Sequence, residues 1–133
     1  METRSFNVSF APHVHDGSSV PRIMWTVFAA LVPAAAVSVY AFGLDALRVL
    51  ALSTLSCMAM EALALVIMKR NPRASLDGSA ALTGFLLGLT LPAGLSNGII
   101  LVGAFVAIIV AKQVFGGLGH NPFNPALTSR VFL

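Results

Sequence analysis

Two long apolar runs set the fold class of this chain. Residues 23–42 form a run of 20 without a charged side chain, and residues 49–68 form another 20 with Glu61 as the single acid. A helix needs about 20 predominantly apolar residues to cross a hydrocarbon core of about 30 Å. In hydrocarbon every backbone N–H and C=O needs a partner within the protein, which a helix supplies. The runs therefore predict an all-α membrane protein.

The remaining composition limits the kinds of function. Charged residues make up 10% of the chain, against about 25% in soluble domains. Cys57, the one cysteine, can form no internal disulfide, and we expect it to be a buried structural thiol. The sequence contains no pattern of metal ligands, paired carboxylates or nucleophile and base. We therefore predict no catalytic residue and no metal site in this chain. Membrane topology accounts for its net charge of +3, so we predict no nucleic-acid partner either.

Further apolar segments complete the expected membrane domain. The third is short: Gly78 to Leu91 covers about 21 Å as a helix, so either its ends are buried in protein or it is a broken, partly re-entrant helix. We expect four spans and the start of a fifth after a cytoplasmic tail. The predicted ranges are 1–22 for the tail and 23–133 for the domain, with spans at 23–42, 49–68, 76–91 and 97–114 and a helix start at 125–133.

Basic residues orient these spans. They gather before the first span, after the second and around the glycine-rich segment, as Arg4, Arg22, Lys69, Arg70, Arg73, Lys112 and Arg130. If the third span crosses, these regions lie on one side, which the positive-inside rule makes cytoplasmic. The N-terminus is then cytoplasmic as well. Arg48 is the exception, and near a helix end it can snorkel to the interface.

Polar residues inside the spans suggest where helices meet. At about 100° per residue, Glu61 shares one stripe of its helix with Ser53, Thr54 and Cys57, and we expect this stripe to face protein. Glu61 is either a station on an ion or proton pathway or a carboxylate bonded to the next helix. In the third span the Gly84 and Gly88 pair allows close helix packing, and a lining role for part of that helix is the alternative.

Residues 113–126 read QVFGGLGHNPFNPA and follow an apolar run. Irregular backbone at membrane depth is tolerated where it is buried in protein or lines a polar cavity. Asn124 can cap a new helix that begins at Pro125. The glycines follow a helix and not a strand, which excludes a dinucleotide fingerprint. A site for a cofactor, ion or solute and a sharp turn between helices both fit this pattern.

Several motifs together resemble the NqrB/RnfD family of membrane subunits. They are APH at 11–13, RIMW at 22–25, LVPA at 31–34, DGSAALTG at 77–84, LTLP at 89–92, AKQVFGGLG at 111–119 and NPFNPA at 121–126. The short N-terminal tail favours the RnfD branch, which belongs to the Rnf (Rsx) electron-transport complex.

The resemblance implies a helical fold of urea-transporter type built from two inverted repeats. It also implies flavin-mediated electron transfer between ferredoxin and NAD, coupled to sodium or proton translocation, in the cytoplasmic membrane of a bacterium or archaeon. The partners would be the other Rnf-type subunits and the lipid bilayer. By the resemblance, noncovalent riboflavin would lie near the glycine-rich segment, contacted by Asn121 and Asn124, given room by Gly116, Gly117 and Gly119, and stacked on Phe123.

The chain also departs from the family pattern. Members attach FMN to a threonine in a Ser-Gly-Ala-Thr motif, which is absent here, so we expect the covalent FMN in a downstream segment. The chain amounts to about the first inverted repeat, and we expect it to be the N-terminal portion of a longer subunit; a split gene or a degenerate paralogue is the alternative. A small-solute channel of urea-transporter type and a non-redox assembly subunit are the other functions considered.

Overall fold

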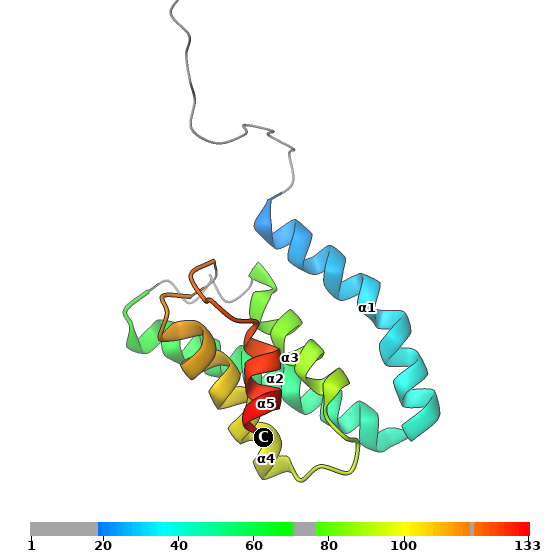
Figure 1. Cartoon of the computed structure of the whole chain (residues 1–133). Helices are drawn as coiled ribbons and strands as arrows, with labels where there is room; N and C mark the ends of the chain where they lie inside the picture. The colour runs from blue at the N-terminus through cyan, green and yellow to red at the C-terminus, as the bar shows by residue number, and fades with distance from the viewer. Residues whose placement is uncertain (1–18, 71–76, 118) are drawn as a thin grey trace, which may run out of the picture.

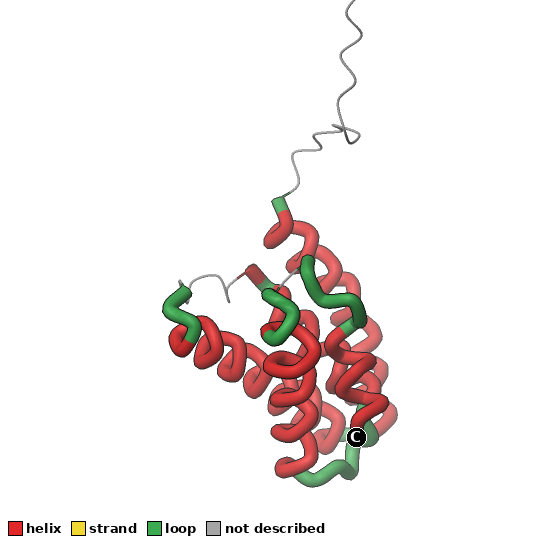
Figure 2. Tube along the Cα trace, turned by 60° about the vertical axis from the view of Figure 1, so that its left-hand side comes forward, coloured by secondary structure: helices red, strands yellow, loops and turns green. Residues whose placement is uncertain are grey.

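The computed structural model describes residues 19–70, 77–117 and 119–133, and these residues are helical with no strand (Figures 1 and 2). The helices are α1 (Val20–Phe42), α2 (Leu44–Ile67), α3 (Ser79–Thr90), α4 (Asn97–Phe105), the π-helix η2 (Val106–Gln113) and α5 (Pro125–Phe132). The all-α prediction is confirmed. Most of the tail predicted over 1–22, together with Arg73, lies outside the described residues.

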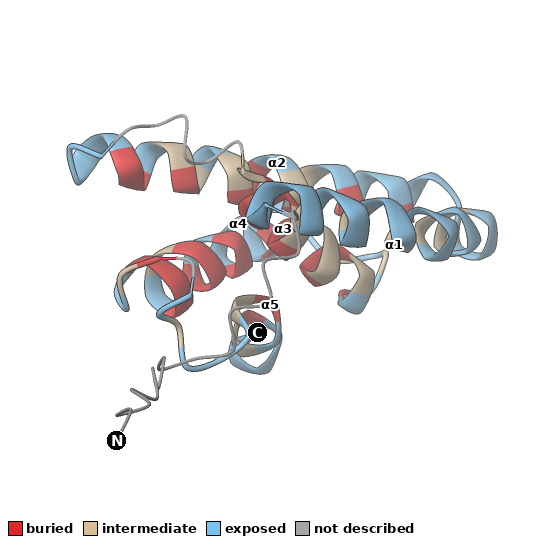
Figure 3. Ribbon diagram, turned by 90° about the horizontal axis from the view of Figure 1, so that it is seen from above, coloured by how far each residue is buried: buried red, intermediate tan, exposed pale blue. Residues whose placement is uncertain are grey.

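Within that described part, two helices have the length and composition to cross a membrane. They are α1, with 23 residues, and α2, with 24. At 1.5 Å per residue they measure about 35 and 36 Å, enough for the hydrocarbon core. Gly43 joins them with a φ of 72°, a left-handed backbone that glycine adopts without strain. No residue of α1 is buried in the chain, and Figure 3 shows most of this helix as exposed.

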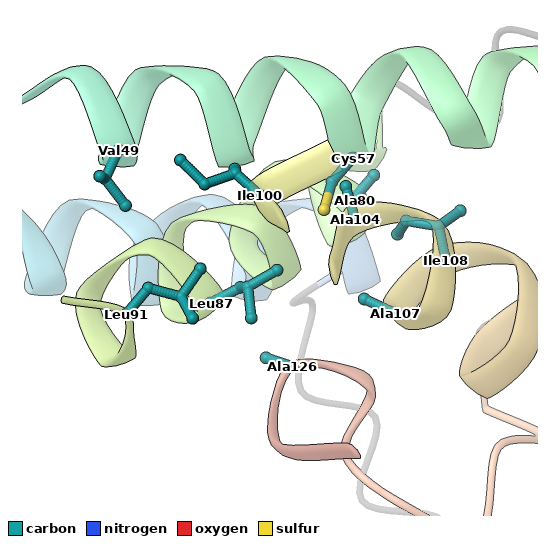
Figure 4. Close-up of a cluster of buried hydrophobic side chains, with 10 residues drawn as sticks. All are labelled: Val49, Cys57, Ala80, Leu87, Leu91, Ile100, Ala104, Ala107, Ile108 and Ala126. Atoms are coloured by element: carbon teal, nitrogen blue, oxygen red, sulfur yellow. The ribbon is translucent and has the colours of Figure 1, made fainter. Parts of the chain in front are cut away.

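Helix α3 packs tightly on α2 through its glycines. A Cβ placed on Gly84 would lie 2.5 Å from the Ser53 carbonyl oxygen, and one on Gly88 would lie 2.5 Å from the Ser53 Oγ. The expected small-residue packing is therefore present. The core around this contact is apolar (Figure 4) and consists of Val49, Cys57, Ala80, Leu87, Leu91, Ile100, Ala104, Ala107, Ile108 and Ala126.

Helix α3 is short, at 12 residues or about 18 Å. It is uninterrupted, and Ser79 at its start and Leu91 just past its end are both buried. Of the two readings of this segment, the structure favours a short helix whose ends are covered by protein. The Asp77 carboxylate accepts a hydrogen bond of 2.9 Å from the Ser79 N–H, which satisfies one orphan donor at the helix start.

The predicted fourth span is one continuous helix whose second half is a π-helix. α4 ends at Phe105 and η2 begins at the next residue. α5 packs beside it, where the Ser129 hydroxyl donates a hydrogen bond of 2.6 Å to the Gly103 carbonyl oxygen. A Cβ on Gly103 would lie 2.7 Å from the Leu133 Cδ1, so glycine allows this close approach.

Contacts between helix ends sort them onto two sides of the bundle. On one side Arg70 after α2 donates to the Gly116 carbonyl oxygen at 3.3 Å, and Trp25 near the start of α1 contacts Gly78 before α3. On the other side Arg48 near the start of α2 donates to carbonyl oxygens of the α3–α4 loop at 3.2 and 3.0 Å. The helices therefore alternate in direction, as successive membrane spans do.

Candidate functional site

A buried ion pair joins α2 to the end of η2. The Glu61 Oε1 lies 2.6 Å from the Lys112 Nζ, and the two side chains are 6% and 2% exposed. Lys112 also donates a hydrogen bond of 2.6 Å to the Ser79 hydroxyl at the start of α3. Gln113 donates through Nε2 to the same Glu61 oxygen at 3.3 Å. We call Glu61, Ser79, Lys112 and Gln113 the Glu61 cluster.

The π-helix explains how two successive residues reach one carboxylate. Its ladder ends with i to i+5 hydrogen bonds, from Val114 N–H to the Ile109 carbonyl at 3.0 Å and from Gly117 N–H to the Lys112 carbonyl at 3.1 Å. A π turn holds more residues than an α turn, so neighbouring side chains are separated by a smaller angle. Lys112 and Gln113 can thus both point at Glu61. Such π segments are rare in proteins, and those that do occur often lie at functional sites.

The Glu61 cluster leaves two buried acceptors without a donor. Among the described residues, neither the Glu61 Oε2 nor the Gln113 Oε1 has a hydrogen-bond partner. Nearly all buried polar atoms in native structures have a partner, and an unsatisfied one destabilises the fold by about 1–3 kcal/mol. Two such oxygens beside one ion pair therefore mark a place where a cation, a proton or water can bind.

Three of the four residues of the predicted polar stripe on α2 face protein, whereas Thr54 is half-buried and lines the groove between α1 and α2. Ser53 and Cys57 are fully buried and Glu61 is 4% exposed. Lys112 is a partner of Glu61 that the sequence analysis did not predict, although the sequence offers a reason to expect it. Lys112 is the one lysine or arginine between 77 and 129, and an intramembrane acid usually has a partner within the protein.

The structure corrects the count of basic residues used for orientation. Lys112 is buried and forms an ion pair with Glu61. It therefore adds no surface charge beside the glycine-rich segment. Arg130 lines a cavity of about 380 Å³ with Thr90 and Pro92, at the end of α3 opposite Ser79. Lys112 and Arg130 therefore no longer count toward the predicted cytoplasmic side. Within the described residues, Arg22, Lys69 and Arg70 still support that orientation.

A cavity of about 360 Å³ adjoins the Glu61 cluster. Its wall combines amides, hydroxyls, an aromatic ring and the Lys112 side chain, and it consists of Met24, Ser79, Leu82, Thr83, Leu86, Lys112, Asn121, Pro122, Phe123, Asn124 and Pro125. We call it the asparagine cavity. Small-molecule sites typically occupy about 300–1,000 Å³ and combine apolar walls with a few polar groups. A larger groove of about 790 Å³ between α1 and α2 has an almost entirely apolar lining.

The two asparagines each use one side-chain atom locally. Asn124 caps α5, because its Oδ1 accepts from the N–H groups of Ala126 at 3.0 Å and Leu127 at 3.5 Å. The predicted helix start at Asn124 and Pro125 is confirmed. Asn121 donates through Nδ2 to the Phe123 carbonyl oxygen at 3.0 Å. Among the residues that the structure describes, the Asn124 Nδ2 and the Asn121 Oδ1 make no side-chain hydrogen bond and are available to a ligand.

The three glycines form the turn that precedes the asparagines. Gly116, Gly117 and Gly119 have φ values of 105°, 94° and 87°, a region that other residues adopt only with strain. None of them belongs to the lining of the asparagine cavity. Their backbone freedom brings the chain from η2 back to α5, while Asn121, Asn124 and Phe123 meet at the cavity.

Comparison with known proteins places this arrangement in a family. The family model for the NQR2, RnfD, RnfE family matches residues 7–133. The chain is 41% identical over 129 residues to a subunit of the ion-translocating oxidoreductase complex of Cronobacter sakazakii, covering 96% of this chain and 37% of the relative.

Two further relatives carry more specific names. The chain is 41% identical over 128 residues to a subunit of the proton-translocating ferredoxin:NAD(+) oxidoreductase complex of Clostridium ljungdahlii, covering 96% of this chain and 38% of the relative. It is 43% identical over 133 residues to the counterpart from the Na(+)-translocating complex of Acetobacterium woodii, covering 100% and 42%. The chain thus spans about two fifths of the length of these relatives. It belongs to the NQR2, RnfD, RnfE family.

Proposed function

We propose that this chain forms part of a membrane subunit of a flavin-dependent electron-transport complex, which couples electron transfer between ferredoxin and NAD to the movement of sodium ions or protons. Its partners are the other membrane and peripheral subunits of that complex. The names of the relatives support this function. One structural observation carries it: the asparagine cavity shares Lys112 and Ser79 with the buried Glu61 cluster.

We assign a noncovalent flavin, riboflavin, to the asparagine cavity. The Asn121 Oδ1 and the Asn124 Nδ2 offer an acceptor and a donor to the polar edge of a ring, and Phe123 offers a face for stacking. Lys112 adds a positive charge on the same wall. A bound flavin supplies the electron-transfer chemistry, while the protein supplies position and electrostatics. Covalent FMN belongs to a downstream segment of the subunit.

Glu61 is the residue we place on the ion pathway. It is a buried carboxylate inside a long apolar helix, and it carries an oxygen without a donor among the described residues. Ionisable residues at such positions commonly mark ion or proton routes. The alternating helices further support a repeat of urea-transporter type, in which a second repeat would complete the site.

The experiment that tests the flavin proposal uses the full-length subunit in its purified complex. The visible spectrum is recorded before and after acid precipitation, which releases noncovalent flavin and retains covalent flavin with the protein. We expect a released fraction. A correctly assembled complex without flavin absorbance would refute the redox function and leave a solute channel or an assembly role.

Variants of the asparagines locate the noncovalent site. Asn124→Ala removes both the amide and the helix cap, and a lost cap destabilises the protein by about 0.5–2 kcal/mol. Asn124→Ser keeps a capping oxygen and removes only the Nδ2. It therefore tests the contact of the amide with flavin without loss of the helix cap. We expect Asn121→Ala and Asn124→Ser to lower the released flavin while the covalent fraction stays constant. Full occupancy of both flavins in these variants would show that the cavity is not the site.

A further inference from the structure

Lys112 lies between two polar environments. Its Nζ is 2.6 Å from the Glu61 carboxylate and 2.6 Å from the Ser79 hydroxyl, and both Lys112 and Ser79 line the asparagine cavity. A lysine side chain is flexible and carries three rotatable donors. The ammonium group can therefore turn from Glu61 toward the cavity and keep its hydrogen bond to Ser79.

Departure of Lys112 would free oxygen atoms for a cation, once the Gln113 amide, whose Nε2 faces Glu61, turns its Oε1 toward the carboxylate. The Glu61 Oε2 and the Gln113 Oε1 already lack donors among the described residues, and the Gln113 amide is held at the carboxylate by the 3.3 Å contact. Hard cations prefer carboxylate and carbonyl oxygens. A buried carboxylate also needs one positive counter-charge, because an uncompensated buried charge is strongly destabilising. Lys112 and a monovalent cation are thus alternative counter-ions.

We propose that Glu61 and Gln113 form a site for a monovalent cation, Na⁺ or a proton, from which Lys112 is the displaceable counter-ion. This inference rests on the proposed ion-translocating function and adds the exchange partner and its second position. A negative charge in the asparagine cavity would favour the second position of Lys112, because the ammonium group lines that cavity. Lys112 therefore links the occupancy of the cavity to the occupancy of Glu61.

The test measures how often the Glu61 carboxylate separates from Lys112. Dicyclohexylcarbodiimide modifies protonated carboxyl groups in apolar surroundings, and peptide mass spectrometry gives the modified fraction of Glu61. The assembled complex with the full-length subunit is labelled at one fixed pH, in NaCl or in choline chloride at equal ionic strength. The variants are Lys112→Met, Lys112→Arg and Gln113→Leu, and Glu61→Gln identifies the modified site.

We expect slow but measurable labelling of wild-type Glu61, because Lys112 leaves it part of the time. Lys112→Met should label at least tenfold faster, since the competitor is gone. Lys112→Arg should label several times more slowly than wild type, since the guanidinium forms a bidentate pair with carboxylate. Protection by Na⁺ that is lost in Gln113→Leu identifies a sodium site, whereas labelling that Na⁺ leaves unchanged identifies a proton site.

One result would overturn the exchange. If wild-type Glu61 stays unlabelled while Glu61 of Lys112→Met is fully modified, the pair is a static structural bridge. If Lys112→Met does not assemble, a second reference for full modification is needed. An accessible carboxyl group elsewhere in the wild-type complex that is completely modified then serves as that reference. The flavin content of each preparation is recorded first. A flavin-loaded wild-type complex without Glu61 labelling refutes this inference alone, and a complex without flavin refutes the proposed function.

Discussion

Removing one partner of the Glu61–Lys112 pair should destabilise the subunit far more than removing both. At 2.6 Å the attraction between the two charges is about 6 kcal/mol for an effective dielectric constant of about 20. Burial of each ion costs several kcal/mol, so the net contribution of the pair is small. A single replacement leaves the other charge buried without a counter-ion, which typically costs about 3–5 kcal/mol.

The predicted outcome is a double-mutant cycle with a large coupling energy. Glu61→Gln and Lys112→Met should each lower the free energy of unfolding by about 3–5 kcal/mol. The double variant should return to within about 1.5 kcal/mol of wild type, because it replaces the pair with neutral groups of similar volume. Denaturant titration of the detergent-purified full-length subunit, followed by helix content, measures each value.

The exposed pair between Arg48 and Asp45 is the matched control. Its atoms are 4.0 Å apart and its side chains are 43% and 70% exposed. Exposed pairs contribute about 0–1 kcal/mol, so Asp45→Asn should change stability by no more than that. The reasoning is refuted if Lys112→Met costs as little as Asp45→Asn. It is also refuted if the double variant is no more stable than the less stable of the two single variants. The loss of stability would then come from altered packing and not from a buried charge without a counter-ion.

Packing contacts give two more predictions, both measured as thermal stability of the purified subunit. Gly84→Ala should destabilise by about 1–3 kcal/mol, because its Cβ would lie 2.5 Å from the Ser53 carbonyl oxygen, whereas Gly98→Ala has nothing within 4 Å and should be neutral or stabilising. Equal effects of the two would contradict the close α2–α3 contact. Ser129→Ala removes the 2.6 Å hydrogen bond to Gly103 and should cost about 0.5–1.5 kcal/mol; an unchanged melting temperature would show that this bond does not hold α5 on α4.

Local features were predictable from the sequence because their causes lie in neighbouring residues. The length and apolarity of residues 23–42 and 49–68 require helices in a membrane, where backbone polar groups have no water to bind. Asn124 followed by Pro125 specifies a helix start, since the cap and the first turn are adjacent in the chain. The Gly84 and Gly88 pair indicated close packing, although it could not name α2 as the partner.

The candidate site depended on tertiary structure. Glu61 and Gln113 are 52 positions apart, and no local rule brings them together. Their meeting requires η2 to lie against α2 and to widen into a π-helix, which turns Lys112 and Gln113 toward the same carboxylate. The positions of the helices and of the charged residues follow from neighbouring residues in the chain. The burial of Lys112 against Glu61 depends on helix packing, because a buried charge is compensated by what lies beside it in space.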